Sequence, residues 1–192
     1  MWTFLKRQSP TESTHPPHFN MKVILFMAVS VNGIIATPNG EEDFLSHENW
    51  VNFIDLAKKA GNFIYGRKTY ESVIKWPERF LKDIQDIPFP VVISNQLEKA
   101  GNGFIIAKSP ENAIKTLEEK GCEKILLTGG SVNNNSFAKK GLIDEVIFNI
   151  NPVIVGQGIP VFAADDFEID LELIEHKTLN KDTVQLHYKV LK

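Results

Sequence analysis

Short apolar runs alternate with longer amphipathic stretches along most of this chain. The run at 21–28 is nearly unbroken, too short for a typical helix and rich in Val, Ile and Phe, so it predicts a buried strand. The same pattern predicts further strands at 62–65, 90–93, 104–107, 124–127 and 144–150. Two more runs close the chain, at 171–176 and 184–191, and predict a hairpin.

The stretches between these runs show helical spacing and helix-end signals. Trp50, Phe53, Ile54 and Ala57 fall on one helical face, and Gly61 follows, which predicts a helix over about 46–60. Further helices are predicted at 69–74, at 109–120 and from the glycine pair at 129–130 to about 140. The proline-flanked segment 76–88 is expected to be a loop.

This order of elements predicts the fold class. Strands that alternate with helices indicate an α/β fold, with a mostly parallel central sheet covered by helices on both faces. The terminal hairpin would add an antiparallel edge. Residues 21–192 are expected to form one domain, and residues 1–20, rich in Pro, Ser and Thr, a flexible N-terminal extension.

Composition and charge narrow the class of protein. The 192 residues are 43% apolar with a net charge of −3, which argues against a nucleic-acid or membrane-surface protein. No apolar run approaches the length of a membrane span, and the single cysteine, Cys122, excludes an internal disulfide. We expect a cytoplasmic protein without nucleic-acid or membrane partners, with a small molecule as its ligand and with no metal site.

Two strand-to-helix junctions carry the candidate chemistry. At 126–131 an apolar strand runs into Gly129-Gly130 and a helix, and at 64–69 a strand runs into Gly66 and a second helix. Helix N-termini present free N–H groups and a partial positive charge, and glycine lets a ligand approach the backbone. The pair of junctions predicts a pyrophosphate-binding site for a nucleotide cofactor, although G-x-G-x-x-G and the lysine-bearing P-loop are absent.

At these residues the chain resembles the dihydrofolate reductase superfamily over roughly 21–191. The segments 28–36 and 66–72 are similar to dihydrofolate reductases, whereas 141–146 and 152–158 resemble the reductase domain of riboflavin-pathway deaminase-reductases. The resemblance implies a single-domain, three-layer reductase fold and an NADPH cofactor. It also implies a small heterocyclic substrate and, as in riboflavin-type relatives, a possible homodimer.

The resemblance also implies which residues contact NADPH. It places the adenosine 2′-phosphate near Arg67 and Ser94, the pyrophosphate at Thr69 and the glycine pair, and nicotinamide near Ala28, Ile34 and Ile35. An arginine pairs well with a phosphate, which favours NADPH over NADH. The full set of expected cofactor residues is Ala28, Ile34, Ile35, Gly66, Arg67, Lys68, Thr69, Ser94, Asn95, Thr128, Gly129, Gly130, Ser131 and Val132.

The proton donor and the substrate contacts are expected nearby. The family's carboxylate corresponds best to Glu48, with the loop residues Glu42 and Asp43 as competitors, and each is alternatively a solvated carboxylate. Asn149 and Phe53 are expected to contact the substrate, although Asn149 is alternatively a cap at the end of the sheet.

The implied activity is NADPH-dependent hydride transfer to a pteridine-type ring, with dihydrofolate as the leading substrate. Pro88 stands where dihydrofolate reductases carry an arginine for the folate carboxylate, and Arg79 is a possible substitute. The alternative is a riboflavin-biosynthesis reductase acting on a ribosylaminopyrimidine phosphate, although its ribose-phosphate motif is missing. A non-catalytic NADPH-binding protein is the third hypothesis.

Overall fold

The computed structural model describes residues 21–192, and the N-terminal extension expected at 1–20 lies outside this range. Ten strands and five helices follow one another in these residues. Their bounds are β1 Lys22–Ser30, β2 Ile34–Ala36, α1 His47–Ala60, β3 Asn62–Gly66, α2 Arg67–Val73, α3 Glu78–Gln85, β4 Phe89–Ile93, β5 Ile105–Ala107, α4 Pro110–Glu119, β6 Lys124–Leu127, α5 Ser131–Ala138, β7 Glu145–Asn151, β8 Ile159–Pro160, β9 Leu171–Thr178 and β10 Val184–Val190.

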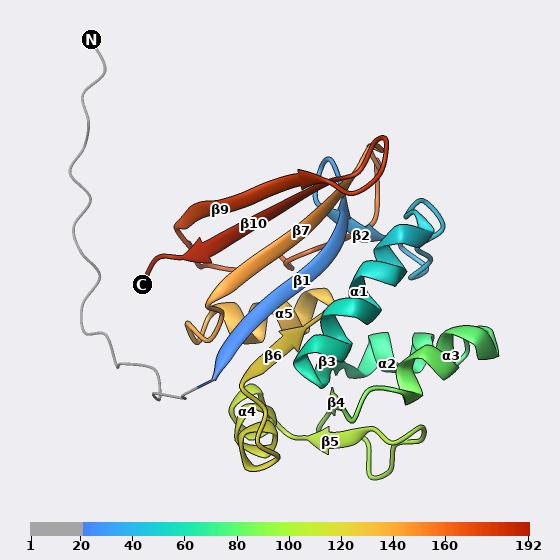
Figure 1. Ribbon diagram of the computed structural model, residues 1–192, viewed down its shortest axis with the longest axis vertical. Helices are drawn as coiled ribbons and strands as arrows, with labels where there is room; N and C mark the ends of the chain where they lie inside the picture. Colours follow the sequence, from blue (N-terminus) through green and yellow to red (C-terminus); the bar gives the residue numbers. More distant parts are fainter. Residues whose placement is uncertain (1–20) are drawn as a thin grey trace.

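Eight strands form one central sheet in the order β5-β4-β3-β6-β1-β7-β10-β9 (Figure 1). The first six are parallel, and β10 runs antiparallel to both β7 and β9. The expected α/β class, the mostly parallel sheet and the antiparallel C-terminal hairpin are therefore confirmed.

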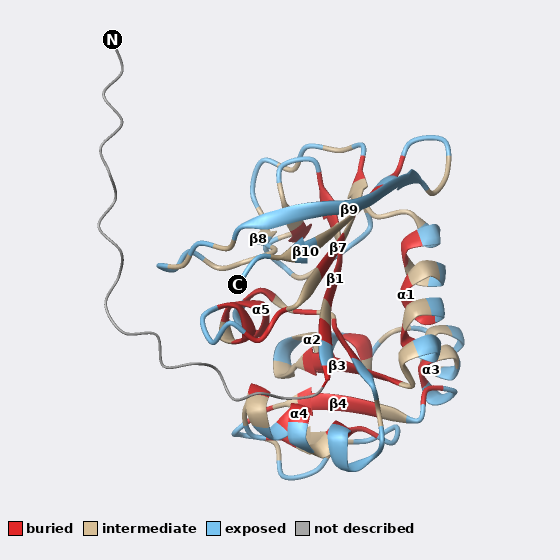
Figure 2. Ribbon diagram, turned by 60° about the vertical axis from the view of Figure 1, so that its left-hand side comes forward, coloured by how far each residue is buried: buried red, intermediate tan, exposed pale blue. Residues whose placement is uncertain are grey.

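Helices cover both faces of the sheet because the strands carry apolar side chains on both faces. From β1, Val23 and Leu25 pack in the core cluster that includes Ile114 of α4 and Phe137 of α5. Phe26, on the opposite face of β1, packs in the cluster that α1, α2 and α3 cover. Buried residues accordingly lie between the helices and the sheet in Figure 2, whereas the outer surfaces of the helices are exposed.

The segment 76–88 contains a helix, α3, and the expectation of a loop is wrong there. Pro77 occupies the position before the first helical residue, where its missing N–H and fixed φ suit a helix start. Leu81 and Ile84, one helical turn apart, pack against the same core cluster as Ile87, which follows the helix. The flanking prolines mark the ends of a helix and not the interior of a loop.

A small second sheet pairs β2 with β8, which the sequence pattern did not predict because both strands are very short. Gly158 permits this pairing, since a Cβ there would collide with the carbonyl oxygen of Ala36 and the side chain of Ile34. The 152–158 segment thereby comes to lie against the strand that follows the Asn32-Gly33 turn.

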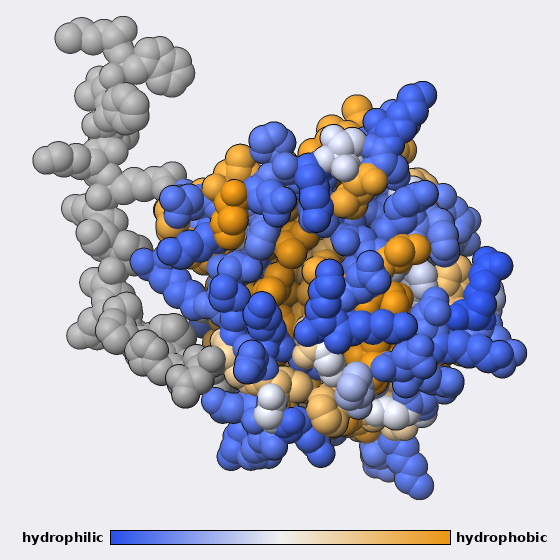
Figure 3. Space-filling model, viewed as in Figure 1, coloured by the Kyte–Doolittle hydropathy of each residue, from blue (hydrophilic) through white to orange (hydrophobic). Residues whose placement is uncertain are grey.

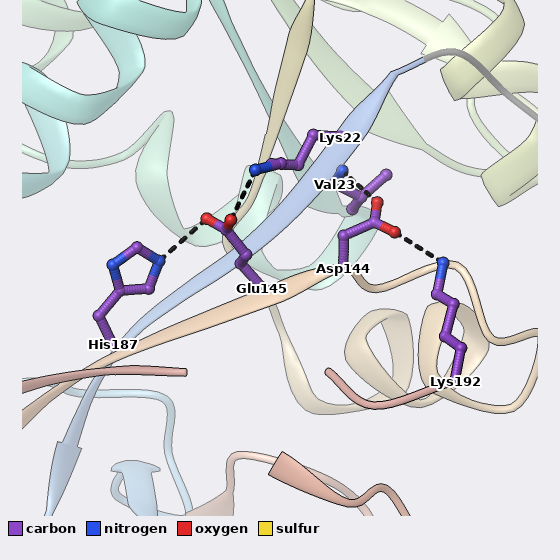
Figure 4. Close-up of polar contacts among 6 residues, drawn as sticks. All are labelled: Lys22, Val23, Asp144, Glu145, His187 and Lys192. Carbon is purple, nitrogen blue, oxygen red and sulfur yellow. Dashed lines mark hydrogen bonds and ion pairs between the residues drawn. The ribbon is translucent and has the colours of Figure 1, made fainter. Parts of the chain in front are cut away.

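A charged cluster holds together the amino-terminal ends of β1 and β7 (Figure 4). The ammonium of Lys22 lies 2.7 Å from Glu145 Oε1, and His187 Nε2 lies 2.9 Å from Glu145 Oε2. The Asp144 carboxylate accepts from the backbone N–H of Val23 at 2.8 Å and from the Lys192 ammonium at 2.6 Å. This cluster lies at the end of the sheet opposite to the glycine junctions.

Candidate functional site

The two glycine junctions meet at the carboxyl ends of β3 and β6, which lie side by side in the sheet. The backbone N–H of Gly66 donates to the carbonyl of Gly129 at 2.7 Å. A Cβ on Gly130 would lie 3.0 Å from Thr69 Oγ1, and one on Gly66 would lie 3.1 Å from Asn133 Cβ. The structure therefore brings both junctions into one surface, and glycine is what allows them to approach so closely.

Both helices at this surface begin without a side-chain cap. Gly66 is the N-cap of α2 and Gly130 the N-cap of α5, so neither contributes a side-chain oxygen to the first-turn N–H groups. The Ser131 hydroxyl, in the first turn of α5, is buried and has no hydrogen-bond partner among the described residues. Free N–H groups and an unpartnered hydroxyl at two helix starts suit an anion such as a diphosphate.

A cavity of about 660 Å³ opens from these junctions across the carboxyl ends of the strands. Its volume suits a small organic ligand, since ligand pockets typically hold about 300–1,000 Å³. Thr69, Thr128, Gly129 and Gly130 form one end of its wall. Ala28 and Ile35 continue the wall beside β1, where the sequence led us to expect a nicotinamide ring.

The opposite end of the cavity is aromatic. Trp50 and Phe53 of α1 lie across from Trp76, which precedes α3, and Phe80, which belongs to α3. The Trp50 ring centroid lies 5.4 Å from that of Phe53, 5.6 Å from that of Trp76 and 5.1 Å from that of Phe80. These rings form a wall suited to a planar ligand, because aromatic faces stack on flat heterocycles. Phe53 was expected at the site; the other three were treated as core or loop residues.

Acidic residues line the cavity from the loop before α1. Glu42 and Asp43 belong to its wall, whereas Glu48 is exposed and does not. The phase of α1 explains this difference: Asn49 lies one turn before Phe53 and shares its buried face, which directs Glu48 away. The structure thus leaves the loop carboxylates as the acidic groups at the cavity.

Glu42 is the carboxylate with the most perturbed ionisation. Burial of the carboxyl group raises its pKa to about 7. Tyr65, a buried neighbour in the wall, has a pKa raised by burial and by the negative charge of Glu42. Glu42 and Tyr65 both belong to the wall of the cavity.

Arg67, expected to hold a 2′-phosphate, is paired with a carboxylate. Its Nη1 lies 2.6 Å and 2.8 Å from the two oxygens of Glu71, one helical turn further along α2. About a third of the Arg67 side chain is exposed, at 31%. A phosphate at this position would have to share or displace the Glu71 partner.

Several other expected cofactor residues lie away from the cavity wall. Ser94 Oγ accepts from the N–H groups of Gln96 and Leu97, so it stabilises a local turn. The other expected cofactor residues that lie outside the cavity wall are Ile34, Gly66, Lys68, Asn95, Ser131 and Val132. Gly66 and Ser131 are next to the wall, at the two glycine junctions.

Asn149 is not in the cavity wall, in contrast to the expectation that it contacts substrate. It is fully buried, its Nδ2 donates to Asn52 Oδ1 at 3.1 Å, and its Oδ1 accepts from Gln185 Nε2 at 2.8 Å. The amide is thus used to fasten α1 and β10 to the end of β7, which matches the alternative role at the end of the sheet.

The chain is similar to known proteins over most of its length. The RibD C-terminal domain model matches residues 21–185. The uncharacterized protein YwjB of Bacillus subtilis (strain 168) is 31% identical over 170 residues, which covers 87% of this chain and 97% of YwjB.

Solved structures share the fold. A putative riboflavin biosynthesis protein from Shewanella sp. PV-4 superposes with a TM-score of 0.71 at 23% identity, covering 90% of this chain and 100% of that one. A pyrimidine reductase-like protein from Corynebacterium diphtheriae gives a TM-score of 0.71 at 17% identity, covering 90% and 92%. The chain belongs to the RibD C-terminal domain family, a family of NAD(P)H-dependent reductases.

Proposed function

We propose that this protein is an NADPH-dependent reductase that transfers a hydride to a planar nitrogen heterocycle of the pyrimidine type. The observation that carries the proposal is the single cavity that has two uncapped, glycine-bearing helix starts at one end and an aromatic wall at the other. The first end suits the diphosphate of a dinucleotide, and the second suits a flat ring.

The residues present fit such a cofactor. Thr69 and Gly130 line the cavity beside the starts of α2 and α5, and the buried Ser131 hydroxyl lacks a partner among the described residues. Ala28 and Ile35 would orient the nicotinamide and keep water from it, as hydride transfer requires. A reduced nicotinamide supplies the hydride when bound.

Glu42 is our choice for the group that holds the proton. Its raised pKa keeps a large fraction of the carboxyl protonated near neutral pH, and it lies in the cavity wall. Protonation of the substrate ring by Glu42 would make the adjacent carbon a better hydride acceptor. Asp43 is a second carboxylate at the wall, whereas Glu48 of α1 lies outside it.

The comparisons favour a pyrimidine-type substrate over dihydrofolate, the leading substrate in the sequence analysis. One of the structural neighbours is described as pyrimidine reductase-like and another as a putative riboflavin biosynthesis protein. No finding supports a folate substrate, and Pro88 stands where dihydrofolate reductases carry their folate-binding arginine.

The test measures NADPH oxidation with two substrates in parallel, the ribosylaminopyrimidine phosphate and dihydrofolate. The reaction is monitored by the loss of the absorbance of reduced nicotinamide. We expect turnover with the pyrimidine and little with dihydrofolate. Turnover with dihydrofolate alone would restore the folate hypothesis. Tight NADPH binding by calorimetry without turnover of either substrate would instead favour a non-catalytic binding protein.

A further inference from the structure

Arg79 supplies the only permanent positive charge in the cavity wall formed by residues 21–192. The other charged residues there are Glu41, Glu42 and Asp43, all acidic, and His47 is the only other basic side chain. An anionic group on a ligand would be repelled by the acidic loop and attracted to Arg79. The charge pattern thus assigns one end of the cavity to an anion.

No carboxylate neutralises Arg79 among the described residues. Asp83 lies one turn along α3 and is its natural partner, but Asp83 Oδ2 instead accepts from the indole N–H of Trp50 at 2.8 Å. Glu78, the adjacent acid, pairs with Lys82 at 3.1 Å. The surrounding acids are therefore engaged elsewhere, and the guanidinium keeps its hydrogen-bond donors available.

Arg79 is exposed, and its guanidinium lies against the aromatic wall. Its Cζ lies 4.8 Å from the centre of the Phe80 ring, a cation–π contact. Phe80 in turn lies 5.8 Å from Trp76, measured between ring centroids. The Trp50–Asp83 hydrogen bond ties α3 to α1, so the cation sits on an anchored element. A guanidinium stacked on a ring still presents its edge to a carboxylate or phosphate.

We propose that Arg79 is a specificity residue that binds an anionic substituent, a carboxylate or a phosphate, on a flat ligand packed against Trp76 and Phe80. The inference deepens the proposed function, because it takes this ligand to be the substrate of the reductase. The substrate is therefore an anionic heterocycle and not a neutral one.

The experiment measures binding and not turnover. Two pairs of probes differ only in the anion: 6-hydroxymethylpterin against pterin-6-carboxylate, and riboflavin against riboflavin 5′-phosphate. Affinity is read from quenching of the tryptophan fluorescence of the full chain, because Trp50 and Trp76 line the cavity. The first pair reports a carboxylate and the second a phosphate.

The variants are Arg79→Met, Arg79→Lys and the control Lys82→Met on the same helix. We expect the wild type to prefer the charged member of at least one pair by about 10-fold or more, as for a charge-assisted hydrogen bond. Arg79→Met removes this preference without changing the affinity for the uncharged member, Arg79→Lys keeps part of it, and Lys82→Met keeps all of it.

The proposal is overturned if the wild type binds the charged and uncharged members equally or binds none of the probes. It is also overturned if Arg79→Met weakens both members of a pair alike. A preference for anions that depends on Arg79 but occurs in a protein without NADPH oxidation would support the anion site and reject the reductase. The two proposals can therefore fail separately.

Discussion

Single carboxylates differ sharply in what their surroundings allow. Glu42 lines the cavity, whereas Glu48, six residues later, lies in the first turn of α1 on its exposed side. Burial raises the pKa of Glu42 toward neutrality. A residue's place in the sequence motif matters less here than the direction in which the folded backbone presents it.

We expect Glu42→Gln to lower the rate of substrate reduction by about 100-fold or more, the usual contribution of a general acid. The wild-type rate should fall as pH rises through about 7, since the raised pKa keeps the carboxyl protonated only below that value. Steady-state pH profiles of both proteins check this. Glu48→Gln is the control and should retain the wild-type profile; a large loss in Glu48→Gln with normal Glu42→Gln would reverse our assignment.

Arg67 and Glu71 give a prediction about cofactor choice. Arg67→Ala should weaken NADPH binding by about 1.5–3 kcal/mol and leave NADH nearly unchanged, because one charge-assisted phosphate contact is lost. Glu71→Gln should strengthen NADPH binding, since it releases the Arg67 guanidinium from its carboxylate partner. Calorimetric titrations with both coenzymes provide the measurement. Equal effects on NADPH and NADH would show that Arg67 does not contact the 2′-phosphate.

At the scale of elements, the Glu145 carboxylate of β7 links this strand to Lys22 of β1 and His187 of β10. Burial alone would raise the pKa of Glu145, but hydrogen bonds from Lys22 and His187 outweigh it and lower the pKa below its usual 4.5 (Figure 4). The hydrogen bond to Glu145, and then the negative charge of that carboxylate, raise the pKa of Lys22 above its usual 10.5. The pair is thus favoured in its charged form.

The sign of these shifts predicts a pH dependence of stability. Because the pKa of Glu145 is lowered in the folded protein, its contribution to the free energy of unfolding is complete above pH 4.5, its usual pKa. This contribution is lost as the pH falls through the pKa of Glu145 in the folded protein. The raised pKa of Lys22 means that its contribution is lost only at strongly alkaline pH. We expect Glu145→Gln to reduce the free energy of unfolding by about 1 kcal/mol at neutral pH and less in acid, since Lys22 is half exposed. Urea titrations at several pH values test this, with Glu175→Gln on exposed β9 as control.

At the scale of the whole molecule, one edge of the sheet stays uncovered. All eight residues of β9 are exposed, and this strand is shown in the exposed colour in Figure 2. Leu173 and Ile174 each expose 51% of their surface, and apolar side chains reach the surface over this hairpin in Figure 3. An exposed edge strand presents unpaired backbone N–H and C=O groups and is a ready partner for another strand.

We predict that a second copy of the chain covers this edge and that the protein is a homodimer. Leu173→Lys combined with Ile174→Lys should convert it to a monomer, because two charges would replace the apolar contact. Light scattering coupled to gel filtration measures the mass. Val51→Lys, a similarly exposed site on α1, should leave the dimer intact. A wild type that is monomeric at high concentration would refute the prediction.

No helix among residues 21–192 is long and apolar enough to cross a membrane. The whole molecule is instead arranged around the cavity at the carboxyl ends of its parallel strands, the position at which open α/β sheets commonly bind ligands. The charged cluster at Glu145 and the cavity therefore occupy opposite ends of the sheet.

The sequence by itself determined most of the elements and the presence of glycine at the two strand-to-helix junctions. Local patterns suffice for this, since alternation, helical spacing and glycine after a strand act over a few residues. The phase of α1 was also readable, because Phe53, Ile54 and Ala57 define a face that includes Asn49 and excludes Glu48.

Only the tertiary structure decided what surrounds the cavity. Trp50, Trp76 and Phe80 come from separate segments, and α3 had to be recognised as a helix before Arg79 could be placed beside them. The amide of Asn149 bonds to Asn52 and Gln185, which are distant from it in the sequence. Cavity walls, counter-ions and raised pKa values depend on neighbours distant in the chain, and local sequence carries no record of those distances.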